Sequence, residues 1–378
     1  MLAKELLKKY LEGNCTEEEK AIVETWYVQH RVKTQKALTD AEQTRDIHQI
    51  INYLDTRVPG ARKVQLWPRI AAAATILLFL SVSGYFLLHK QAGQQLVQNH
   101  PYDIAPGGNK AILTSHGRKI ILDNAKNGLI ATNGSVAVNK KADGLISYDA
   151  SQASNTNITM VYDTITIPRG GQYQLKMSDG SKVWLNAATI LRYPEKFAGK
   201  ERKIELISGE AYMEVVHNKA MPFKVLVKGQ VIEDLGTHFN INAYDDEELI
   251  KTTLLEGSVK VNTGGQAFLL KPGQQAQVNA TTHLVSVHNV DTEDEIAWKN
   301  GLFTFHNASI QTVLRQLARW YDVKIEYEGQ IPDRMFSGDI YRNTTALQAL
   351  DLLSFTKVHF RIEKGADGHS EKKIVVTP

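Results

Sequence analysis

The stretch Ile70-Ala-Ala-Ala-Ala-Thr-Ile-Leu-Leu-Phe-Leu-Ser-Val-Ser-Gly-Tyr-Phe-Leu-Leu88 contains no charged residue and divides the chain into two unequal parts. As a helix that rises about 1.5 Å per residue, it covers roughly 28 Å, close to the hydrocarbon thickness of a bilayer. A buried core helix is the alternative, but core helices are seldom apolar on every face over such a length. A cleaved signal peptide is disfavoured because about seventy residues precede the stretch. The sequence therefore predicts a single transmembrane helix within residues 69–90.

The flanks of this stretch indicate its orientation in the bilayer. Basic residues crowd its amino-terminal side, namely Arg57, Arg62, Lys63 and Arg69. After it, Lys90 stands alone until Lys110. Because basic residues favour the cytoplasmic side, we expect the amino terminus inside the cell and residues 91–378 outside. The residues expected at the two membrane interfaces are Trp67, Arg69, Tyr85 and Lys90.

Composition excludes some partners. The 378 residues carry a formal net charge of +3 with both signs mixed throughout, and no basic stripe points to direct binding of nucleic acid. The only cysteine, Cys15, lies on the inner side. We therefore expect the outer part to be stabilised by its core alone, without disulfides or cysteine metal sites.

The inner segment, residues 1–68, is predicted to form a small all-α domain and a linker. Thr16-Glu-Glu-Glu19 and Thr39-Asp-Ala-Glu42 are capping boxes, and each precedes apolar residues at helical spacing. Because a domain of this size has a small core, some apolar side chains are expected to be buried against a partner protein. The alternative is that these side chains only pack against one another. The candidates for partner contact are Leu7, Leu11, Ile22, Val23 and Trp26.

The outer segment begins with a polar spacer, residues 91–104, and continues as a predicted all-β domain over residues 105–290. Short runs of alternating β-branched and polar residues are separated by turns such as Ser178-Asp-Gly-Ser181. An internal echo runs through it, because Gly107–Leu122 aligns with Gly170–Leu185 at an offset of 63 with six of sixteen positions identical. Two hairpins of one design, stacked or paired, are the simplest explanation.

Residues 297–378 read as a doubled β-α-β unit. A strand is predicted over Trp298–Phe305, then a helix capped by Asn307 or Ser309, then a strand over Val323–Tyr327. The order repeats with Met335–Ile340, a helical pattern from Ala346 to Leu353, and strands over Val358–Ile362 and Lys373–Thr377. This predicts an α+β module at the carboxy terminus.

No motif in the chain indicates an enzyme. The nucleophile elbow, the zinc-protease helix, the phosphate loop and the dinucleotide fingerprint are all missing, so no catalytic, cofactor-binding or metal-binding residue is predicted. His238 is expected to be packed or bonded in a turn, and the acidic run Asp245–Glu248 to be a solvated turn rather than a calcium loop. Trp184 lies in an alternating strand and is expected to have a core or half-buried role; stacking on a sugar, alone or with Trp298, is the alternative.

Several motifs of the outer segment resemble, in order, the ferric-citrate regulator (FecR) family, and most closely its form in the Bacteroidetes. These are Ile167–Ala187, Tyr193-Pro194, Gly209-Glu-Ala-Tyr212, Pro222-Phe223, Leu235-Gly-Thr-His-Phe-Asn240, Leu255-Glu-Gly-Ser-Val259 and Lys271-Pro-Gly-Gln274. The resemblance implies a single-pass anti-sigma factor of the inner membrane, with its outer domains in the periplasm. Its inner domain would restrain an extracytoplasmic-function sigma factor, although this segment is shorter than in proteobacterial members.

The carboxy-terminal module is similar to the secretin and TonB short amino-terminal domain, and Leu317-Ala-Arg-Trp-Tyr321 with Ile331-Pro-Asp-Arg334 matches the Bacteroidetes form. The resemblance implies a signal from a TonB-dependent outer-membrane transducer, and release by an intramembrane or periplasmic protease. Candidate transducer contacts are Trp298, Phe303, Phe305, Trp320 and Tyr321. A membrane-anchored periplasmic glycan-binding or scaffold protein without a sigma partner is the alternative function, and a periplasmic hydrolase is disfavoured by the missing motifs.

Overall fold

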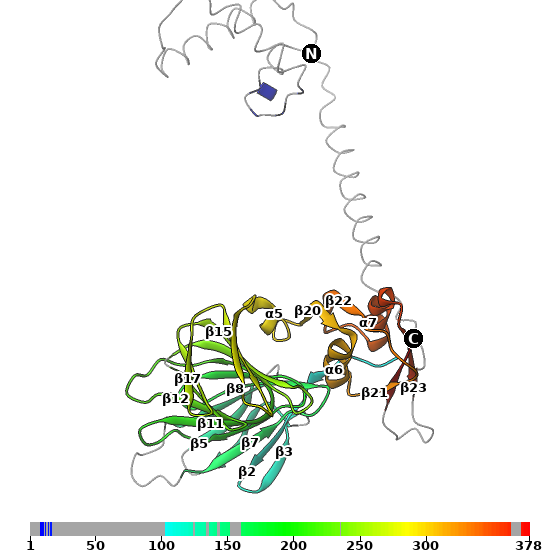
Figure 1. The fold of residues 1–378 in the computed structure, drawn as a ribbon. Coiled ribbons are helices and arrows are strands. Elements are labelled where there is room, and N and C mark those ends of the chain that lie inside the picture. The colour runs from blue at the N-terminus through cyan, green and yellow to red at the C-terminus, as the bar shows by residue number, and fades with distance from the viewer. Residues whose placement is uncertain are drawn as a thin grey trace, which may run out of the picture. The chain divides into compact units, whose positions relative to one another are not determined.

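The structure is a computed structural model that describes residues 8–10, 12, 14, 16, 103–123, 125–133, 136–141, 144–151, 160–234, 236–363 and 372–378 (Figure 1). The chain divides into two compact units, Met1–Gln95 and Leu96–Pro378. Among the described residues, no helix is long and apolar enough to cross a membrane. The predicted span, residues 70–88, lies outside these ranges, as does almost all of the predicted inner domain.

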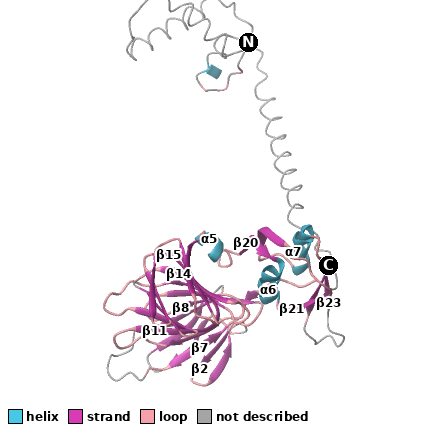
Figure 2. Ribbon diagram, in the orientation of Figure 1, coloured by secondary structure: helices cyan, strands magenta, loops and turns pink. Residues whose placement is uncertain are grey.

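The second unit begins with a domain built of strands in two sheets (Figure 2). The first sheet runs in the order β3 (Arg118–Ile121), β2 (Ile112–Ser115), β7 (Tyr162–Thr166), β10 (Ile190–Pro194), β11 (Arg202–Glu214), β12 (Phe223–Val227), β13 (Gln230–Asp234), β16 (Val259–Thr263) and β17 (Gln266–Leu270). The second runs in the order β4 (Gly128–Asn133), β5 (Val136–Lys141), β6 (Leu145–Asp149), β8 (Gly171–Lys176), β9 (Lys182–Leu185), β11, β14 (His238–Ala243), β15 (Leu249–Glu256), β18 (Gln274–Asn279) and β19 (Val285–Asn289). The all-β prediction for residues 105–290 is confirmed.

The long strand β11 belongs to both sheets. Its first part pairs with β10 and β12, and its second part, from Gly209, pairs with β14 and then also with β9. Gly209 has a φ of 105°, and a Cβ atom there would lie 2.4 Å from the Cα of Thr189. Only glycine fits this position, since both the backbone angle and the close approach exclude a side chain.

The core of the domain lies between the inner faces of the two sheets. Along β8 and β12, buried and half-buried residues alternate, as the period of a strand dictates. Leu175, Leu206, Phe223 and Phe239 are completely buried in this core. Burial of each such side chain contributes about 1.5–3 kcal/mol relative to leaving it exposed to water.

The internal echo corresponds to two real hairpins, β2–β3 and β8–β9, which lie in different sheets. Among the described strands, the two repeats pair with each other only where each repeat begins. The short strand β1 (Gly108–Asn109) pairs in parallel with β8, and Gly108 lies opposite Gly171, the residue at the predicted offset of 63. The two hairpins are therefore not paired along their length, and they contribute side chains to one core between the sheets.

The carboxy-terminal module contains α5 (Thr292–Ile296), β20 (Leu302–Ser309), α6 (Ile310–Tyr321), β21 (Lys324–Tyr327), β22 (Met335–Tyr341), α7 (Ala346–Leu353), the 3-10 turn η1 (Ser354–Thr356), β23 (His359–Glu363) and β24 (Lys373–Thr377). The predicted order of strands and helices is confirmed, and Ser309 caps α6 by accepting from the Thr312 amide. The pairing crosses between the repeats: β20 pairs with β22, while β24 lies between β21 and β23. The first strand begins later than predicted, at Leu302, and continues to Ser309, because Trp298 lies in the turn after α5.

Candidate functional site

The carboxy-terminal module meets the β domain along helix α6, which faces the strands in Figure 1. We call this contact the junction. It comprises Arg315, Arg319, Trp320 and Arg342 of the module and Asn186, Glu210, Tyr244, Asp246 and Glu247 of the β domain. Its side chains are mainly charged or aromatic, so its chemistry differs from that of the apolar cores on either side.

Two arginines of α6 bind the acidic turn after β14. Arg319 is almost fully buried; its Nη1 donates to Asp246 Oδ1 at 2.7 Å and its Nη2 to Glu247 Oε1 at 3.0 Å. Its guanidinium also lies 3.9 Å from the ring centroid of Tyr244. Arg315 donates to both carboxylate oxygens of Glu247, at 3.2 and 2.8 Å. Such fork-shaped pairs fix orientation as well as supplying energy.

These arginines control the charge of the turn. Burial raises the pKa of Glu247, but its hydrogen bond to Arg315 and the positive charges of Arg319 and Arg315 outweigh burial, and its pKa is lowered from 4.5. Glu247 is therefore ionised at neutral pH, as an ion pair requires. The acidic run Asp245–Glu248 was expected to be solvated, but the structure places Asp246 and Glu247 in this contact and Asp245 against Lys228.

Arg342 fills the centre of the junction. It is buried, donates from Nη1 to the Trp298 carbonyl at 3.0 Å and from Nη2 to Asn186 Oδ1 at 2.9 Å, and stacks 3.8 Å from the ring centroid of Trp320. The Trp320 indole donates in return to the Arg342 carbonyl at 2.8 Å. Burial lowers the pKa of Arg342 to about 10, so the guanidinium keeps its charge at neutral pH.

Below Arg342, the buried carboxylate of Glu210 accepts hydrogen bonds from three amides. Asn186 donates to Oε2 at 2.8 Å, and Asn240 and Asn242 each donate to Oε1 at 3.1 Å. Burial raises the pKa of Glu210, and the bonds from Asn186 and Asn240 oppose that effect. This hub ties β9, β11 and β14 together beneath the junction and positions Asn186 for Arg342.

The space enclosed at the junction is only about 10 Å³. That is close to the least volume that accommodates one water molecule, so the junction is a packed contact between two modules and not a binding site for a small molecule.

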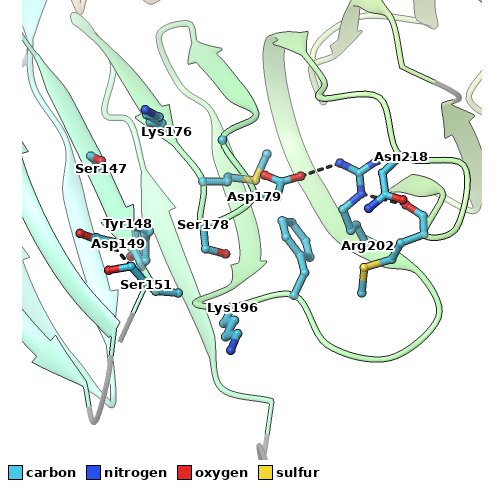
Figure 3. Close-up of a pocket in the computed structure, with 15 residues that line it drawn as sticks. Ser147, Tyr148, Asp149, Ser151, Lys176, Ser178, Asp179, Lys196, Arg202 and Asn218 are labelled. Atoms are coloured by element: carbon cyan, nitrogen blue, oxygen red, sulfur yellow. Dashed lines mark hydrogen bonds and ion pairs between the residues drawn. The ribbon is translucent and has the colours of Figure 1, made fainter. Parts of the chain in front are cut away.

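A larger open pocket of about 640 Å³ lies on the β domain between β6, β8 and β11 (Figure 3). Its wall includes Arg202, whose Nη1 donates to Asp179 Oδ2 at 2.6 Å and whose Nε donates to the Met221 carbonyl. Lys176 and Lys196 also line it. Since Arg202 is buried and its donors are used within the protein, it stabilises the loop after β8 and gives the pocket no evident chemistry.

The five residues predicted to contact a transducer are all buried. Trp298 packs with Tyr212, Phe303 stacks 6.3 Å from Phe305, and Trp320 and Tyr321 lie in the core shared by α6 and α7. In this conformation these side chains hold the module and the junction together, so a partner would meet other residues. The structure places these five side chains in the interior, and their contact with a transducer stays a prediction.

The other predicted sites have mixed outcomes. The sigma-contact candidates Leu7, Leu11, Ile22, Val23 and Trp26 and the interface candidates Trp67, Arg69, Tyr85 and Lys90 lie outside the described residues. His238 lies on the surface with its Nδ1 3.2 Å from Glu256 Oε2. Trp184 is half-buried against Tyr212, as predicted, and Lys299 lies over its ring. Across the described ranges, no group of three or more His, Cys, Asp or Glu side chains is arranged to hold a metal ion.

The junction residues were missed by sequence reasoning even though several lie in the motifs quoted above. Arg319 and Trp320 belong to Leu317–Tyr321, Asn186 closes the long motif Ile167–Ala187, and Glu210 follows Gly209. Arg169, from the same long motif, donates to the Val323 carbonyl at 2.7 Å. Residues from the motifs of the two modules therefore contact one another in the folded chain. Their positions in the sequence alone do not show this contact.

Comparisons with known proteins agree with this division. Residues 163–260 match the model of the FecR protein family, and residues 302–366 match the model of the FecR carboxy-terminal domain. Two crystal structures, at 1.65 and 2.50 Å resolution, of a candidate anti-sigma factor from Parabacteroides distasonis ATCC 8503 are similar to the chain at 27% identity. The matches cover 56% and 57% of this chain and 97% and 99% of those chains, with TM-scores of 0.51 and 0.52. A search of curated proteins returns no match.

Proposed function

The chain belongs to the FecR family, and on that premise we propose that it is an anti-sigma factor of the inner membrane. In this proposal residues 1–68 sequester an extracytoplasmic-function sigma factor in the cytoplasm, and one helix within residues 69–90 crosses the bilayer. The outer domains receive the signal of a TonB-dependent transducer in the periplasm, and a protease then releases the sigma factor. The protein acts by binding rather than by catalysis.

One observation carries the proposal. The two segments that match the family models are also the two modules that the junction clamps together. A partner that binds one module can therefore change the free energy of the other through this contact. Such coupling between distant sites is what a signalling receptor requires, and it needs no catalytic group.

The surface for the transducer is inferred to be the free edge of β22. Among the described strands, β22 pairs only with β20, and most of its residues are exposed. Met335 is 51% and Tyr341 is 66% exposed. An exposed strand edge with apolar side chains is a template for pairing with a strand of another protein. The expected partner is the signalling domain of the transducer, which the resemblance describes as the same kind of module.

The inner half of the proposal is tested by co-purification of the full chain with the sigma factor encoded beside it. Trp26→Ala is expected to weaken retention by about 2 kcal/mol, roughly thirtyfold, if Trp26 is an interface anchor. Trp67→Ala is the matched control, because this tryptophan is assigned to the membrane interface. Failure of the unaltered chain to retain any sigma factor would refute the anti-sigma function.

The outer half is tested by measuring binding of the full chain to the purified transducer signalling domain. Tyr341→Lys with Met335→Lys is expected to reduce affinity at least tenfold with no change in thermal stability, since both side chains are exposed. Leu269→Lys on β17 is the control, because Leu269 is 65% exposed but lies on the β domain. Equal affinity for all three proteins would exclude β22 as the docking edge.

A further inference from the structure

The first described residues of the outer part cross the carboxy-terminal module before they reach the β domain. We call Asp103–Asn109 the strap. Figure 1 shows this segment passing α6 on its way to the strands. It includes the last two residues of the predicted spacer, and Asp103 lies fifteen residues after Leu88, the end of the predicted span. The module that ends the sequence thus contacts the chain close to its predicted exit from the membrane.

The strap is anchored on the start of helix α7. Ile104 is only 2% exposed and lies in the core of the carboxy-terminal module. Its carbonyl accepts from the Ala346 amide at 2.9 Å, and the Asp103 carboxylate accepts from the Leu347 amide at 3.0 Å. The first amides of a helix have no partner within the helix, and a carboxylate is favoured at that end. The strap therefore completes the amino-terminal turn of α7.

The second half of the strap depends on close backbone packing. A Cβ atom on Gly107 would lie 2.8 Å from the ring of Trp320 and 2.9 Å from the Gly170 carbonyl. The next residue, Gly108, donates to that same carbonyl at 3.0 Å and begins the pairing of β1 with β8. The strap therefore runs over the junction and contacts both modules.

We propose that the strap is a releasable latch: docking on α7 shields Asp103–Asn109 from proteases, and displacement of α7 exposes this segment to cleavage. This inference rests on the proposed function and names its regulatory step. The connection from the docking strand β22 to helix α7, on which the strap is anchored, is short, because β22 ends at Tyr341 and α7 begins at Ala346. The four connecting residues include Arg342 of the junction and Thr344, whose carbonyl accepts from the Tyr321 hydroxyl. A partner that pairs with β22 therefore acts next to the strap.

The latch is tested on the full chain in membranes by amide hydrogen exchange and limited proteolysis. Ile104→Asp places a charge in an apolar site and is expected to lower protection of the Ala346 and Leu347 amides about tenfold. Cleavage within the strap should rise by a similar factor, while the amides of the β domain keep their protection. Ala105→Asp is the matched control, because Ala105 is an exposed residue of the same strap.

A milder variant distinguishes release of the strap from general misfolding of the chain. Asp103→Ala removes the acceptor of the Leu347 and Ile104 amides but keeps the Ile104 carbonyl that accepts from Ala346, so protection should fall at Leu347 and not at Ala346. Unchanged exchange and unchanged cleavage in both strap variants would overturn the latch. So would faster cleavage that leaves sigma-dependent transcription at the level of the unaltered chain.

The failure of this inference can be told from failure of the proposed function by one parallel measurement. Sigma retention by the unaltered chain tests the proposed function and does not involve the strap. If the chain retains sigma while the strap variants behave like the control, only the latch is refuted. If no sigma is retained, the anti-sigma function is refuted whatever the exchange data show.

Discussion

Removal of Arg319 should separate the carboxy-terminal module from the β domain. The side chain is almost fully buried and binds Asp246 at 2.7 Å and Glu247 at 3.0 Å, with Tyr244 against its face. Removing one partner of a buried pair costs about 3–5 kcal/mol when the remaining charge is stranded. Here the cost is smaller, because Asp246 is half-exposed to water and Glu247 keeps Arg315. We expect Arg319→Ala to cost about 2–3 kcal/mol, including a cation–π contribution of about 1 kcal/mol.

The assay is urea unfolding of the full chain, followed separately by hydrogen exchange in α6 and in β8–β9. For a loss of about 2–3 kcal/mol, protection in α6 should fall by roughly 30- to 150-fold. Protection in β8–β9 should change much less, because the apolar core between the sheets is untouched. Arg319→Lys should lie between the two proteins, since an ammonium group keeps the charge but loses the two-pronged geometry.

Arg361→Ala is the matched control in the same module. Arg361 also pairs with two carboxylates, Glu328 and Glu363, but it is about half exposed. Exposed pairs are screened by water, so no measurable change is expected. If Arg319→Ala and Arg361→Ala lowered protection equally, the junction would not be the contact that couples the modules.

Three further predictions concern other parts of the chain. Because the pKa of Glu247 is lowered in the fold, its stabilising effect is present above pH 4.5 and is lost as the pH falls through the lowered value; α6 protection should drop there, and Glu247→Gln should abolish this pH dependence. Gly209→Ala should lower the melting temperature of the β domain, with strain alone costing about 1–3 kcal/mol, since a Cβ atom would collide with Thr189. Gly229→Ala, with a positive φ but open space, should cost less, and a larger loss there would contradict the crowding argument. Leu78→Arg should cost about 2.5–3.5 kcal/mol of insertion free energy, and unchanged export of residues 91–378 would refute the predicted span.

The strands of the β domain and the order of the carboxy-terminal module could be predicted because both depend on local periodicity. The alternation Val183-Trp184-Leu185 places two side chains inside and one at the surface, and the structure has that pattern. The cap of α6 also depends on local sequence, and of the two predicted candidates, Asn307 and Ser309, the structure has Ser309. Short-range patterns of this kind survive folding because the buried face of each element is set by its own sequence.

The junction could not be predicted because it depends on pairs far apart in the sequence. Arg319 and Asp246 are 73 residues apart, and Arg342 and Asn186 are 156 apart. Charged and polar residues such as these are common on protein surfaces. For this reason the sequence predicts that the acidic turn Asp245–Glu248 is exposed to solvent. The surroundings of Trp320 and Tyr321 could not be predicted either, because both follow the apolar face of α6 and their spacing does not distinguish a partner's surface from another module of the same chain.

The composition of the junction bears on how a signal could pass through it. Each module has its own apolar core, whereas the contact between them is made largely of ion pairs and stacked arginines. Polar contacts between domains permit relative motion more readily than apolar ones. A transducer that binds the separated state better by about 3 kcal/mol would offset the expected contribution of Arg319 and shift the equilibrium by more than a hundredfold. The strap would then lose its support on α7 in the same step. Under the proposed function, the junction therefore needs only modest binding energy to convert docking at β22 into exposure of the strap.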